Sequence, residues 1–563
     1  MCGIIGVIGK NGQDKIINGL LNMEYRGYDS CGMAYFFNNK INIIKTLESP
    51  KKLKTEDSFN VGIGHTRWAT HGKVSEKNSH PIPSYNDRFV IVHNGVLENS
   101  NEIRQKYLAN INFKTETDTE VLINLITYFS LKNSLLDSIK NASKIIKGSY
   151  AFLILDINDD SSIYLACDNM PLIIGKGEDI VTIASDVLAF DNEIKEISRI
   201  PDKFIGKISK KEKINIHFEP FNFTENKIKK ENKFHMYDEI LHESESIKQI
   251  YNTYFINNKE IKKIRKIFKN KNSVSFIASG SSYNACKVAE YFLNKKYKIK
   301  TNVYLASEFI YNKTPISDIY FIVSQSGETA DTIKALKKIH TKSLTISLTN
   351  VKTSTIAKNC KYNFDMLCGR EVSVASTKAF VSSIFFFYCL FNNEILFEKI
   401  LYAINKVIKD EKTIYDFAKK IKDYNNFIFL GRGLDGIINL ENILKIKEIT
   451  YLNVESYFGG ELKHGPLALI DDKSFIFITN TNDLTNDIMR ANTIEVLTRG
   501  GNCLVFSSIK NKEINDFYSF EVNNDEAIFP CCVFFQIFAY YLSVLKGNNP
   551  DRPKNLAKSV TVE

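Results

Sequence analysis

Paired cysteines and metal-binding motifs are missing from this sequence. Its ten cysteines are scattered along 563 residues, with no C-x-x-C motif and no paired spacing with the nine histidines. Such usage is typical of a reducing compartment and differs from that of disulfide scaffolds and zinc sites. We therefore expect a cytoplasmic protein that holds no metal.

Long apolar runs and clusters of positive charge are also scarce. Only residues 527–545 approach the length of a membrane span, and Pro530, Gln536 and Ser543 interrupt them, so we interpret them as a buried helix of a core or a dimer interface. The start, MCGIIGVIGK, lacks the features of a signal peptide. The net charge of +10 is spread along the chain among Asn and Ile, which indicates compositional bias. We expect neither a membrane nor a nucleic acid as a partner.

The first three residues, Met1, Cys2 and Gly3, are chemically unusual. If Met1 is removed, Cys2 carries both a thiol and a free α-amine. The amine titrates near neutral pH and the thiol not far above it, so the amine can accept the thiol proton. Cys2 is then a candidate nucleophile that carries its own base. A cysteine at position 2 can also arise by chance, and the motifs that follow decide between the two explanations.

The first half alternates short apolar strands with loops rich in functional groups. Apolar runs predict strands at 4–8 and 89–92. The pattern of apolar residues predicts helices at 14–23 and 121–129. Cys2 then lies at a strand start, which we expect at the edge of a sheet.

Side chains in these loops could complete a glutaminase. A thiolate that attacks an amide needs donors for the tetrahedral oxyanion, and Asn94 with the Gly95 N–H could supply them. Arg67 suits the substrate α-carboxylate and Asp118 its α-ammonium. Each residue also has an ordinary explanation: an Asn-Gly turn, a helix N-cap at the aspartate, and a lone Trp68 in a core.

The second half repeats a unit of strand, small-residue turn and helix. Residues 274–278 and 320–323 are predicted strands, followed by the hydroxyl-rich turns 279–282 and 324–329. Such turns place backbone N–H groups at a helix N-terminus, where they can bind a phosphate. Neither turn has the Gly-Lys-Ser/Thr ending of a P-loop, so a sugar phosphate is favoured over a nucleotide.

The same unit recurs further along the chain. Residues 426–433 and 474–482 echo the two strand-turn segments at a displacement of roughly 150 residues. The second copy has lost the hydroxyl-rich turn, so only the first is expected to hold the phosphate in its own turns. The repeat predicts two doubly wound parallel α/β sheets with their ligand at the strand C-termini.

Four further residues have side chains suited to ketose–aldose chemistry. Lys445 and Glu448 share a helix face, and Glu448 could move a proton between adjacent carbons as base and then acid. An ordinary surface ion pair is the alternative. His464 could open the sugar ring. Lys558 could form a Schiff base with a C2 ketone if burial lowers its pKa, although a lysine in a tail is usually solvated.

Nine motifs taken together carry a family resemblance. The first half contains, in order, MCGIIGVIG, EYRGYDSCG, HTRWATHG, HNGVLEN and TETDTE. These resemble the class II glutamine amidotransferase domain of the N-terminal-nucleophile fold. With EVSVASTKAF, LKIKE, ELKHGP and the final DRPKNLAKSVTVE, the whole chain resembles the glutamine:fructose-6-phosphate aminotransferase family.

The resemblance implies a multi-domain α/β fold, as a chain of this length is expected to have. An N-terminal-nucleophile αββα domain would be followed by two doubly wound parallel-sheet sugar isomerase (SIS) domains. The expected parts are a glutaminase domain at 1–206, a polar linker at 207–236, sugar isomerase domains at 237–400 and 401–548, and a C-terminal tail at 549–563.

The resemblance also implies roles for individual residues. Cys2 would be the nucleophile, with Asn94 and Gly95 as the oxyanion hole. Glutamine would be bound by Arg67, His71, Gly72 and Asp118. The phosphate would be held by Ser281, Ser282, Ser324, Gln325, Ser326 and Thr329, with Val374 and Ser376 near the sugar. The sugar chemistry would involve Lys445, Glu448, His464 and Lys558, and an ammonia passage would be lined by Trp68, Ala557 and Val560.

The implied activity is synthesis of glucosamine 6-phosphate from fructose 6-phosphate and L-glutamine, with release of glutamate and no cofactor. The implied assembly is a homodimer in which His464 reaches the neighbouring subunit's site. Two alternatives stay open: an enzyme of the same plan with another ketose phosphate or amine donor, and a sugar-phosphate-sensing binding protein with a vestigial amidase. A phosphoribosyl-transferring amidotransferase is disfavoured because the second half lacks an acidic pair in an apolar strand ahead of a phosphate loop.

Overall fold

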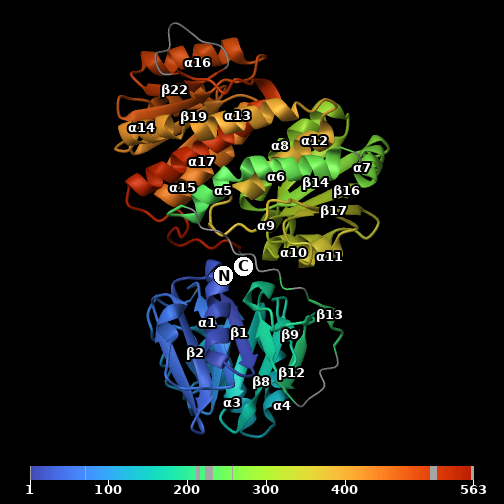
Figure 1. Cartoon of the computed structure of the whole chain (residues 1–563), viewed down its shortest axis with the longest axis vertical. Helices are drawn as coiled ribbons and strands as arrows, with labels where there is room; N and C mark the ends of the chain where they lie inside the picture. The colour runs from blue at the N-terminus through green and yellow to red at the C-terminus, as the bar shows by residue number, and fades with distance from the viewer. Residues whose placement is uncertain are drawn as a thin grey trace. The chain divides into compact units, whose positions relative to one another are not determined.

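The structure, a computed structural model, describes residues 2–69, 71–210, 216–221, 223, 232–256, 258–507 and 517–559. The chain divides into two units, Met1–Lys227 with Ala557–Glu563 and Ile228–Leu556. Each unit has sheets, helices and hydrophobic cores of its own (Figure 1). Paired strands run antiparallel in the first unit and parallel in the second.

Two antiparallel sheets form the centre of the first unit. Their strand orders are β13-β11-β9-β10-β1-β4-β2-β3 and β12-β8-β7-β6-β5. The first sheet contains β1 (Gly3–Ile8), β2 (Ser30–Phe37), β3 (Lys40–Thr46), β4 (Val61–Arg67), β9 (Ile173–Lys176), β10 (Val181–Ala184), β11 (Glu196–Arg199) and β13 (Glu219–Pro220). The second contains β5 (Ile82–Pro83), β6 (Phe89–Gly95), β7 (Tyr150–Asp156), β8 (Asp159–Asp168) and β12 (Phe204–Ser209). The helices are α1 (Gly12–Asn22), α2 (Ser100–Tyr107), α3 (Asp118–Ser130) and α4 (Leu135–Ser143).

The layers follow from the alternation of side chains along the strands. In β1, Ile5 and Val7 join the core beneath α1, whereas Ile4 and Ile8 join the core between the two sheets. Strand β6 alternates in the same way between the core beneath α3 and the core between the sheets. The order of layers is helix, sheet, sheet, helix, which confirms the predicted αββα fold.

Cys2 directly precedes β1, as the sequence predicts, but β1 is not an edge strand. It pairs with β10 on one side and with β4 on the other, and Gly3 lies opposite Thr66. Strand β10 comes from a remote part of the chain, and such a pairing leaves no mark in the local pattern around residue 2. Cys2 therefore lies at the end of a strand in the interior of the sheet.

The second unit contains two parallel sheets with the same strand order, β15-β14-β16-β17-β18 and β20-β19-β21-β22-β23. The first has β14 (Ser273–Ala278), β15 (Lys300–Leu305), β16 (Ile319–Ser324), β17 (Leu344–Thr349) and β18 (Tyr362–Asp365). The second has β19 (Asn426–Gly431), β20 (Val454–Phe458), β21 (Ser474–Thr479), β22 (Asn502–Phe506) and β23 (Phe517–Tyr518). The identical order confirms the predicted repeat of a doubly wound sheet.

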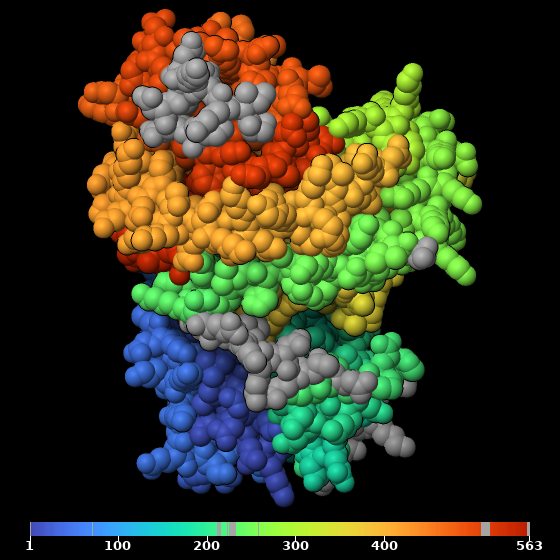
Figure 2. Space-filling view, turned by 45° about the horizontal axis from the view of Figure 1, so that its top comes forward, coloured from blue at the N-terminus to red at the C-terminus, as the bar shows by residue number. Residues whose placement is uncertain are grey.

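Helices surround both sheets of the second unit. They are α5 (His235–Leu241), α6 (Glu243–Ile250), α7 (Lys259–Lys269), α8 (Gly280–Lys296), α9 (Ala306–Phe309), α10 (Ala330–Lys338), α11 (Thr355–Asn359), α12 (Lys378–Phe391), α13 (Phe397–Lys409), α14 (Glu411–Ile421), α15 (Leu434–Thr450), α16 (Asn486–Thr498) and α17 (Ile528–Leu545). In Figure 2, α6 in green runs along α13 in orange, and Ser244 of α6 donates a hydrogen bond to Asn405 of α13 at 2.7 Å. Elements of the two halves thus pack directly on one another.

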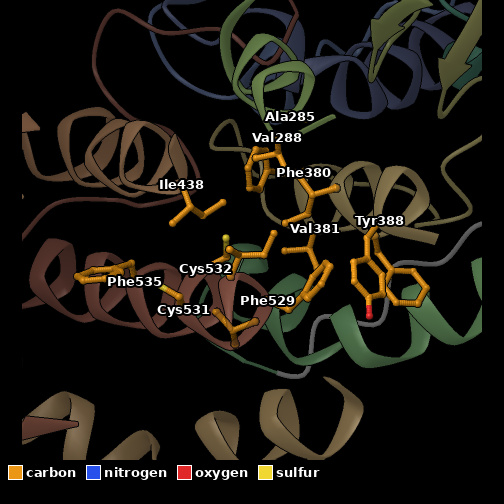
Figure 3. Close-up of a cluster of buried hydrophobic side chains, with 14 of the residues drawn as sticks. Ala285, Val288, Phe380, Val381, Tyr388, Ile438, Phe529, Cys531, Cys532 and Phe535 are labelled. Atoms are coloured by element: carbon orange, nitrogen blue, oxygen red, sulfur yellow. The ribbon is translucent and has the colours of Figure 1, made fainter. Parts of the chain in front are cut away.

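One hydrophobic core is common to both halves of the second unit. It contains Val288 of α8 and Val381 of α12 from the first half, and Ile438 of α15 and Cys532 of α17 from the second. Figure 3 shows these four side chains close together among other buried residues. The two sheets are therefore parts of one folded body, although the sequence predicts them as separate domains.

Helix α17 lies in this core. Among the described residues, Asn524–Leu545 is the one helical stretch long and apolar enough to cross a membrane, and 83% of its most apolar part is buried inside the protein. Its side chains pack against those of α13, α14 and α15. This burial agrees with the interpretation of 527–545 as a core helix.

The first unit extends beyond the expected boundary at residue 206. Strand β12 runs to Ser209 and pairs with β8, and β13 pairs with β11. Ile208 is buried in the core between the sheets, whereas Ile205 packs against the core beneath α3, so side chains of this lysine-rich stretch point to opposite faces as in a strand. At the other end, α5 begins at His235, inside the expected linker.

The expected tail at 549–563 is divided between the two units. The Asp551 carboxylate accepts hydrogen bonds from the backbone N–H groups of His235 and Met236, at 2.9 and 2.8 Å, within the second unit. The residues from Ala557 onward group with the first unit. Val560 lies outside the described residues.

Gly6 offers a test of the packing between the two sheets of the first unit. An added Cβ at Gly6 would lie 2.7 Å from Leu153 Cδ1 and 3.0 Å from Ile163 Cδ1. Gly6→Val should therefore overpack this core and lower the stability of the first unit by about 1–3 kcal/mol. Thermal unfolding followed by circular dichroism measures the change, with Lys40→Val at the exposed start of β3 as the control. An unchanged melting temperature for Gly6→Val would contradict the packing described.

Candidate functional site

The Cys2 thiol lies at the start of β1, beside the loop that follows β4. The Gly3 N–H donates to Thr66 Oγ1 at 3.1 Å, which fixes the first residues of the strand. Strand β4 ends at Arg67, and the next backbone N–H, that of Trp68, donates to Cys2 Sγ at 3.3 Å. The pairing of β1 with β4 thus positions the thiol.

A small pocket opens in front of this thiol. Its lining contains Cys2, Arg67, Trp68, His71, His80, His93, Gly95, Thr117, Asp118 and Thr119. Removal from water raises the pKa of the Cys2 thiol, and the Trp68 N–H and the positive charge of Arg67 oppose the rise. These two groups favour the thiolate, which is the nucleophilic form.

Asn94, at the end of β6, directs its amide group at Cys2. Its Nδ2 donates to the Cys2 carbonyl oxygen at 3.0 Å. Its Oδ1 lies 3.2 Å from His65 Nε2, and the same nitrogen lies 3.0 Å from the His93 carbonyl oxygen. An amide donor beside the nucleophile is suited to an oxyanion.

His65 fixes which way the Asn94 amide points. Burial lowers the pKa of His65 to about 3, so the ring is neutral at ordinary pH. Both partners of its Nε2 are acceptors, so this nitrogen carries the proton and donates it. The Asn94 oxygen is thereby held toward His65 and its NH₂ group toward Cys2. Sequence reasoning missed His65, although it stands in the HTRWATHG motif.

Gly95 has a backbone that only glycine accepts here. Its φ is +136°, and an added Cβ would lie 2.1 Å from the Ser149 carbonyl oxygen. Gly72, with φ of +77°, also has a conformation that other residues rarely adopt. The two glycines let the chain turn sharply at the pocket.

Arg67 and Asp118 bring opposite charges to the pocket. Arg67 is buried, and its guanidinium donates to the carbonyl oxygens of His71 and Gly72, at 2.5 and 3.4 Å. Asp118 is also buried, and its Oδ2 accepts from the Leu97 N–H at 2.8 Å. The N-cap of α3 is instead Thr117, so the N-cap explanation for Asp118 is wrong. A cation and an anion beside a thiol can together hold the zwitterionic end of an amino acid.

Hydrogen bonds from two residues of the EYRGYDSCG motif hold the backbone of the pocket in place. Arg26 donates from Nε to the Cys2 carbonyl oxygen at 3.3 Å and from Nη1 to Asp186 Oδ2 at 2.8 Å. Asp29 Oδ2 accepts from the Ala69 N–H at 2.8 Å and so holds the loop after Trp68. The sequence shows that Arg26 and Asp29 are close together, but their partners become visible only in the fold.

A buried lysine forms the centre of a second site, in the second unit. Lys445 of α15 is 1% exposed, and its Nζ lies 2.7 Å from Glu448 Oε2 and 3.2 Å from Glu441 Oε1. The alternative of a surface ion pair is therefore wrong. Burial alone would lower the pKa of Lys445, but the two carboxylates outweigh it and raise the pKa. Glu441 was missed by sequence reasoning, because the side it faces depends on how α15 packs.

Lys445 also connects α15 to the first hydroxyl-rich turn. Its Nζ donates to Ser281 Oγ at 3.2 Å. Ser281 and Ser282 lie in the first turn of α8, directly after β14. The Lys445–Glu448 pair from one half of the repeat and the predicted phosphate turn from the other half thus belong to one site.

The second hydroxyl-rich turn follows β16, the neighbour of β14 in the sheet. Ser324 Oγ accepts from the Gly327 N–H at 3.1 Å and lies 3.0 Å from Thr329 Oγ1. Ser326 Oγ accepts from the Glu328 N–H at 3.2 Å. Gln325 lies in the same turn. Because β14 and β16 are adjacent and parallel, both turns lie at the same edge of the sheet.

The segment before α12 brings Val374 and Ser376 to one side of the chain. Both are half-buried, whereas Ser373, Ala375 and Thr377 are buried. Glu371 holds the segment in place, because its Oε1 accepts from the Thr377 N–H at 2.9 Å. Val374 and Ser376 are therefore, with Val372, the partly exposed members of this segment.

Three further predicted residues, His464, Ala557 and Lys558, have no described contact with the Cys2 pocket or with the Lys445 site. His464 is exposed, at the end of a short 3-10 helix that follows β20. Ala557 and Lys558 belong to the segment grouped with the first unit, so the role of Lys558 at the sugar site stays a prediction. Within the described ranges, no three or more His, Cys, Asp or Glu side chains are arranged to hold a metal ion.

Comparison with known families finds one kind of domain in the first unit and another, present twice, in the second unit. Residues 65–192 match the glutamine amidotransferase domain, and residues 267–393 and 420–545 each match the SIS domain. The fold and the two sites thus define a class of protein in which a glutamine amidotransferase domain is joined to tandem SIS domains.

Full-length relatives narrow the class. The chain is 35% identical over 606 residues to a glutamine–fructose-6-phosphate aminotransferase [isomerizing] of Staphylococcus epidermidis, with all of both chains covered. The relatives from Staphylococcus aureus and Oceanobacillus iheyensis are also 35% identical, over 614 and 605 residues and with full coverage. The chain belongs to the glutamine–fructose-6-phosphate aminotransferase [isomerizing] family.

Solved structures agree for the second unit. The C-terminal domain of the glucosamine-fructose-6-phosphate aminotransferase from Francisella tularensis matches with a TM-score of 0.54 and 28% identity, covering 57% of this chain and 99% of that one. A putative tagatose-6-phosphate ketose/aldose isomerase from Clostridium novyi matches with a TM-score of 0.51 and 19% identity, covering 58% and 93%. The latter likeness concerns the fold alone.

The buried charges around Lys445 can be tested by stability. Lys445→Met leaves Glu441 and Glu448 without their cation and should destabilise the second unit by about 3–5 kcal/mol. The double substitution Lys445→Met with Glu441→Gln removes one of the two carboxylates and should recover part of this loss. Thermal unfolding of the single and double variants measures both effects. A single variant as stable as the wild type would contradict the burial of this pair.

Proposed function

We propose that this chain synthesises glucosamine 6-phosphate and glutamate from fructose 6-phosphate and L-glutamine. It is an enzyme with two sites, one that releases ammonia from glutamine and one that transfers it to the sugar. The observation that carries the proposal is the pocket that Cys2 lines together with Arg67 and Asp118, with the Asn94 amide bonded to the Cys2 carbonyl oxygen, in a chain whose second unit has a buried carboxylate and amine beside a hydroxyl-rich turn.

In the glutamine site, the Cys2 thiolate attacks the side-chain carboxamide carbon. The tetrahedral oxygen accepts hydrogen bonds from Asn94 Nδ2 and from the Gly95 N–H. Arg67 binds the α-carboxylate and Asp118 the α-ammonium, while His71 and Gly72 complete the binding of glutamine. Collapse of the intermediate expels ammonia and leaves a thioester, which water then hydrolyses to glutamate.

In the sugar site, the two turns hold the phosphate of fructose 6-phosphate. The phosphate-binding residues are Ser281, Ser282, Ser324, Gln325, Ser326 and Thr329, with Val374 and Ser376 against the sugar. Hydroxyl and backbone N–H groups at the start of a helix suit an anion.

The sugar chemistry needs a base, an amine and a ring-opening group. Lys558 condenses with the C2 ketone, ammonia replaces it, and Glu448 moves a proton from C1 to C2. Lys445, held between two carboxylates, holds Glu448 in place through the ion pair between them at 2.7 Å. His464 of a neighbouring subunit opens the sugar ring, so the active form is a homodimer.

The nitrogen atom passes from one site to the other without entering the solvent. Trp68 closes the glutamine pocket toward the outside, and the tail residue Ala557 lines the passage; the resemblance assigns Val560, outside the described residues, to the same role. The reaction replaces the C2 ketone oxygen of the sugar with the amide nitrogen of glutamine and moves hydrogen from C1 to C2. The reaction therefore needs no redox cofactor. From the cysteine usage of the chain, we place the enzyme in the cytoplasm.

Isotope transfer tests the proposed reaction. The enzyme is incubated with amide-¹⁵N glutamine and fructose 6-phosphate in an excess of unlabelled ammonium, and the product is analysed by mass spectrometry. We expect ¹⁵N-labelled hexosamine phosphate, because protected ammonia reaches the sugar before it mixes with the solvent pool. Glutamate without amino sugar would mean that another acceptor is used, and parallel reactions with other ketose phosphates would identify it.

Substitution of the nucleophile separates the two sites. Cys2→Ala should lower glutamine-dependent synthesis at least about a thousandfold, because the covalent intermediate cannot form. Synthesis from ammonium should persist, since the second unit is unchanged. Cys31→Ala, which alters a buried cysteine of the same unit, is the matched control and should retain both activities. Full glutamine-dependent activity in Cys2→Ala would rule out the proposed nucleophile.

A further inference from the structure

The second unit has a further pocket, of about 820 Å³, away from the residues assigned above. Its volume lies in the range usual for small-molecule sites. It is lined by Lys287, Glu290, Tyr291, Asn294, Lys295, Ile437, Asn482, Asp483, Leu484, Asn524 and Asp525. Most of these residues are polar or charged, but their apolar parts contribute more of the lining surface, so the pocket suits a ligand with both polar groups and apolar faces.

The pocket occupies the place in the second sheet that the sugar site occupies in the first. In the first half, the site lies between the turn after β16, the segment before α12, and α15 of the other half. In the second half, the pocket lies between residues 482–484 after β21, residues 524–525 before α17, and α8 of the other half. The two sheets have the same strand order, so these elements correspond one to one.

The charges of the pocket differ from those of the sugar site. Two lysines face three carboxylates, those of Glu290, Asp483 and Asp525. Lys287 and Lys295 are already paired, with Glu290 at 2.7 Å and with Asp525 at 2.6 Å. A further buried carboxylate, Asp435, accepts from the N–H of Thr481 next to the pocket at 2.8 Å. This excess of negative charge disfavours a phosphate.

Asp525 has an acceptor that nothing in the described structure satisfies. The residue is 5% exposed, and its Oδ2 binds Lys295, but its buried Oδ1 has no hydrogen-bond partner. A buried carboxylate oxygen without a partner is costly, and a donor from a ligand would remove that cost. Asp525 is therefore a pocket-lining carboxylate that has one hydrogen-bonding position unfilled, at an oxygen covered by the protein.

The wall around Asp525 is held in place before any ligand arrives. Asn524 Nδ2 donates to Asp483 Oδ2 at 2.8 Å, and the Asp483 N–H donates to Asn524 Oδ1 at 3.0 Å. Leu484, at the rim, is 89% exposed. The reciprocal hydrogen bonds join the two loops, so a ligand would find these polar groups in fixed positions.

We propose that this pocket binds a small hydroxylated molecule that carries an ammonium group and no phosphate, of the amino sugar class. The ammonium interacts with the carboxylates of Asp525 and Asp483, and the hydroxyl groups interact with the asparagine amides. The site is separate from the sugar-phosphate site and does not depend on the activity proposed above.

Binding to the full-length enzyme tests the site. Fructose 6-phosphate is kept at saturation to fill the first site, without glutamine or ammonium, and glucosamine, glucose and glucose 6-phosphate are titrated by calorimetry. We expect glucosamine to bind more tightly than glucose, and glucose 6-phosphate not to bind. No binding of glucosamine would overturn the proposal, and so would tighter binding of glucose 6-phosphate.

Two variants locate the bound glucosamine. Asp525→Asn should weaken binding by about tenfold, because a charge-assisted hydrogen bond is lost. Asp472→Asn changes an exposed aspartate of the same half that does not line the pocket and should have no effect. Equal affinities in wild type and Asp525→Asn would place glucosamine elsewhere and overturn the proposal.

A pair of rim variants tests the sign of the charge without touching the core. Leu484→Lys should weaken glucosamine binding by about threefold, and Leu484→Asp should tighten it by a similar factor, since the charge acts through water. Leu484 is exposed, so neither variant should impair folding, and thermal unfolding verifies this. An unchanged affinity in both variants, or the opposite order, would refute a cationic ligand in this pocket.

Discussion

One buried ammonium group, that of Lys445, constrains the whole second unit. Removing such a charge from water costs several kcal/mol unless partners surround it. Its partners are Glu441 and Glu448 on its own helix and Ser281 on α8 of the other half. The two halves must therefore pack so that α15 and the start of α8 meet. The shared hydrophobic core supplies the apolar contacts that make this arrangement stable, and the site exists only where both halves contribute.

In the first unit, neutral groups rather than charges fix the orientation of a side chain in the site. The Asn94 amide must present its NH₂ group to Cys2, and an amide by itself has no preference between its two ends. His65 supplies the preference, because burial keeps the ring neutral and its N–H bonds the amide oxygen. Both sites thus hold a polar side chain in place by means of a buried neighbour.

Much of the fold could be predicted from the sequence. The repeated unit of strand, turn and helix predicted the two parallel sheets, because that pattern is local, whereas the αββα layers were implied by the family resemblance of the motifs. The pairing of β1 with the remote β10 could not be predicted, since no local signal marks it. The extension of the first unit to β13 was hidden by the lysines of this stretch, although Ile205 and Ile208 contact the cores on opposite faces, as side chains of a strand do.

Residues of the candidate site that belong to a recognisable motif could be predicted from the sequence. Residues whose place in the site depends on tertiary packing could not. Cys2 and Asp118 line one pocket, and the Asn94 amide donates to the Cys2 carbonyl oxygen beside it. The burial of Lys445 could not be read from a helix that has apolar residues on most of its sides. Glu441 and His65 were missed because their role depends on what they face across the fold. Their identity as a glutamate and a histidine was visible, but their orientation was not.

The repeat of two sheets within one chain has a consequence for how such a protein can diverge. In an assembly of two identical copies, every substitution changes both symmetry-related sites at once. In a fused chain, each half mutates alone, and a helix can keep one set of residues while its counterpart acquires another. Here α15 carries Lys445 and Glu448, whereas α8 carries Lys295 paired with Asp525. In one chain, the residues of one site can therefore change while those of the other stay the same, and the common core still holds both sites in place.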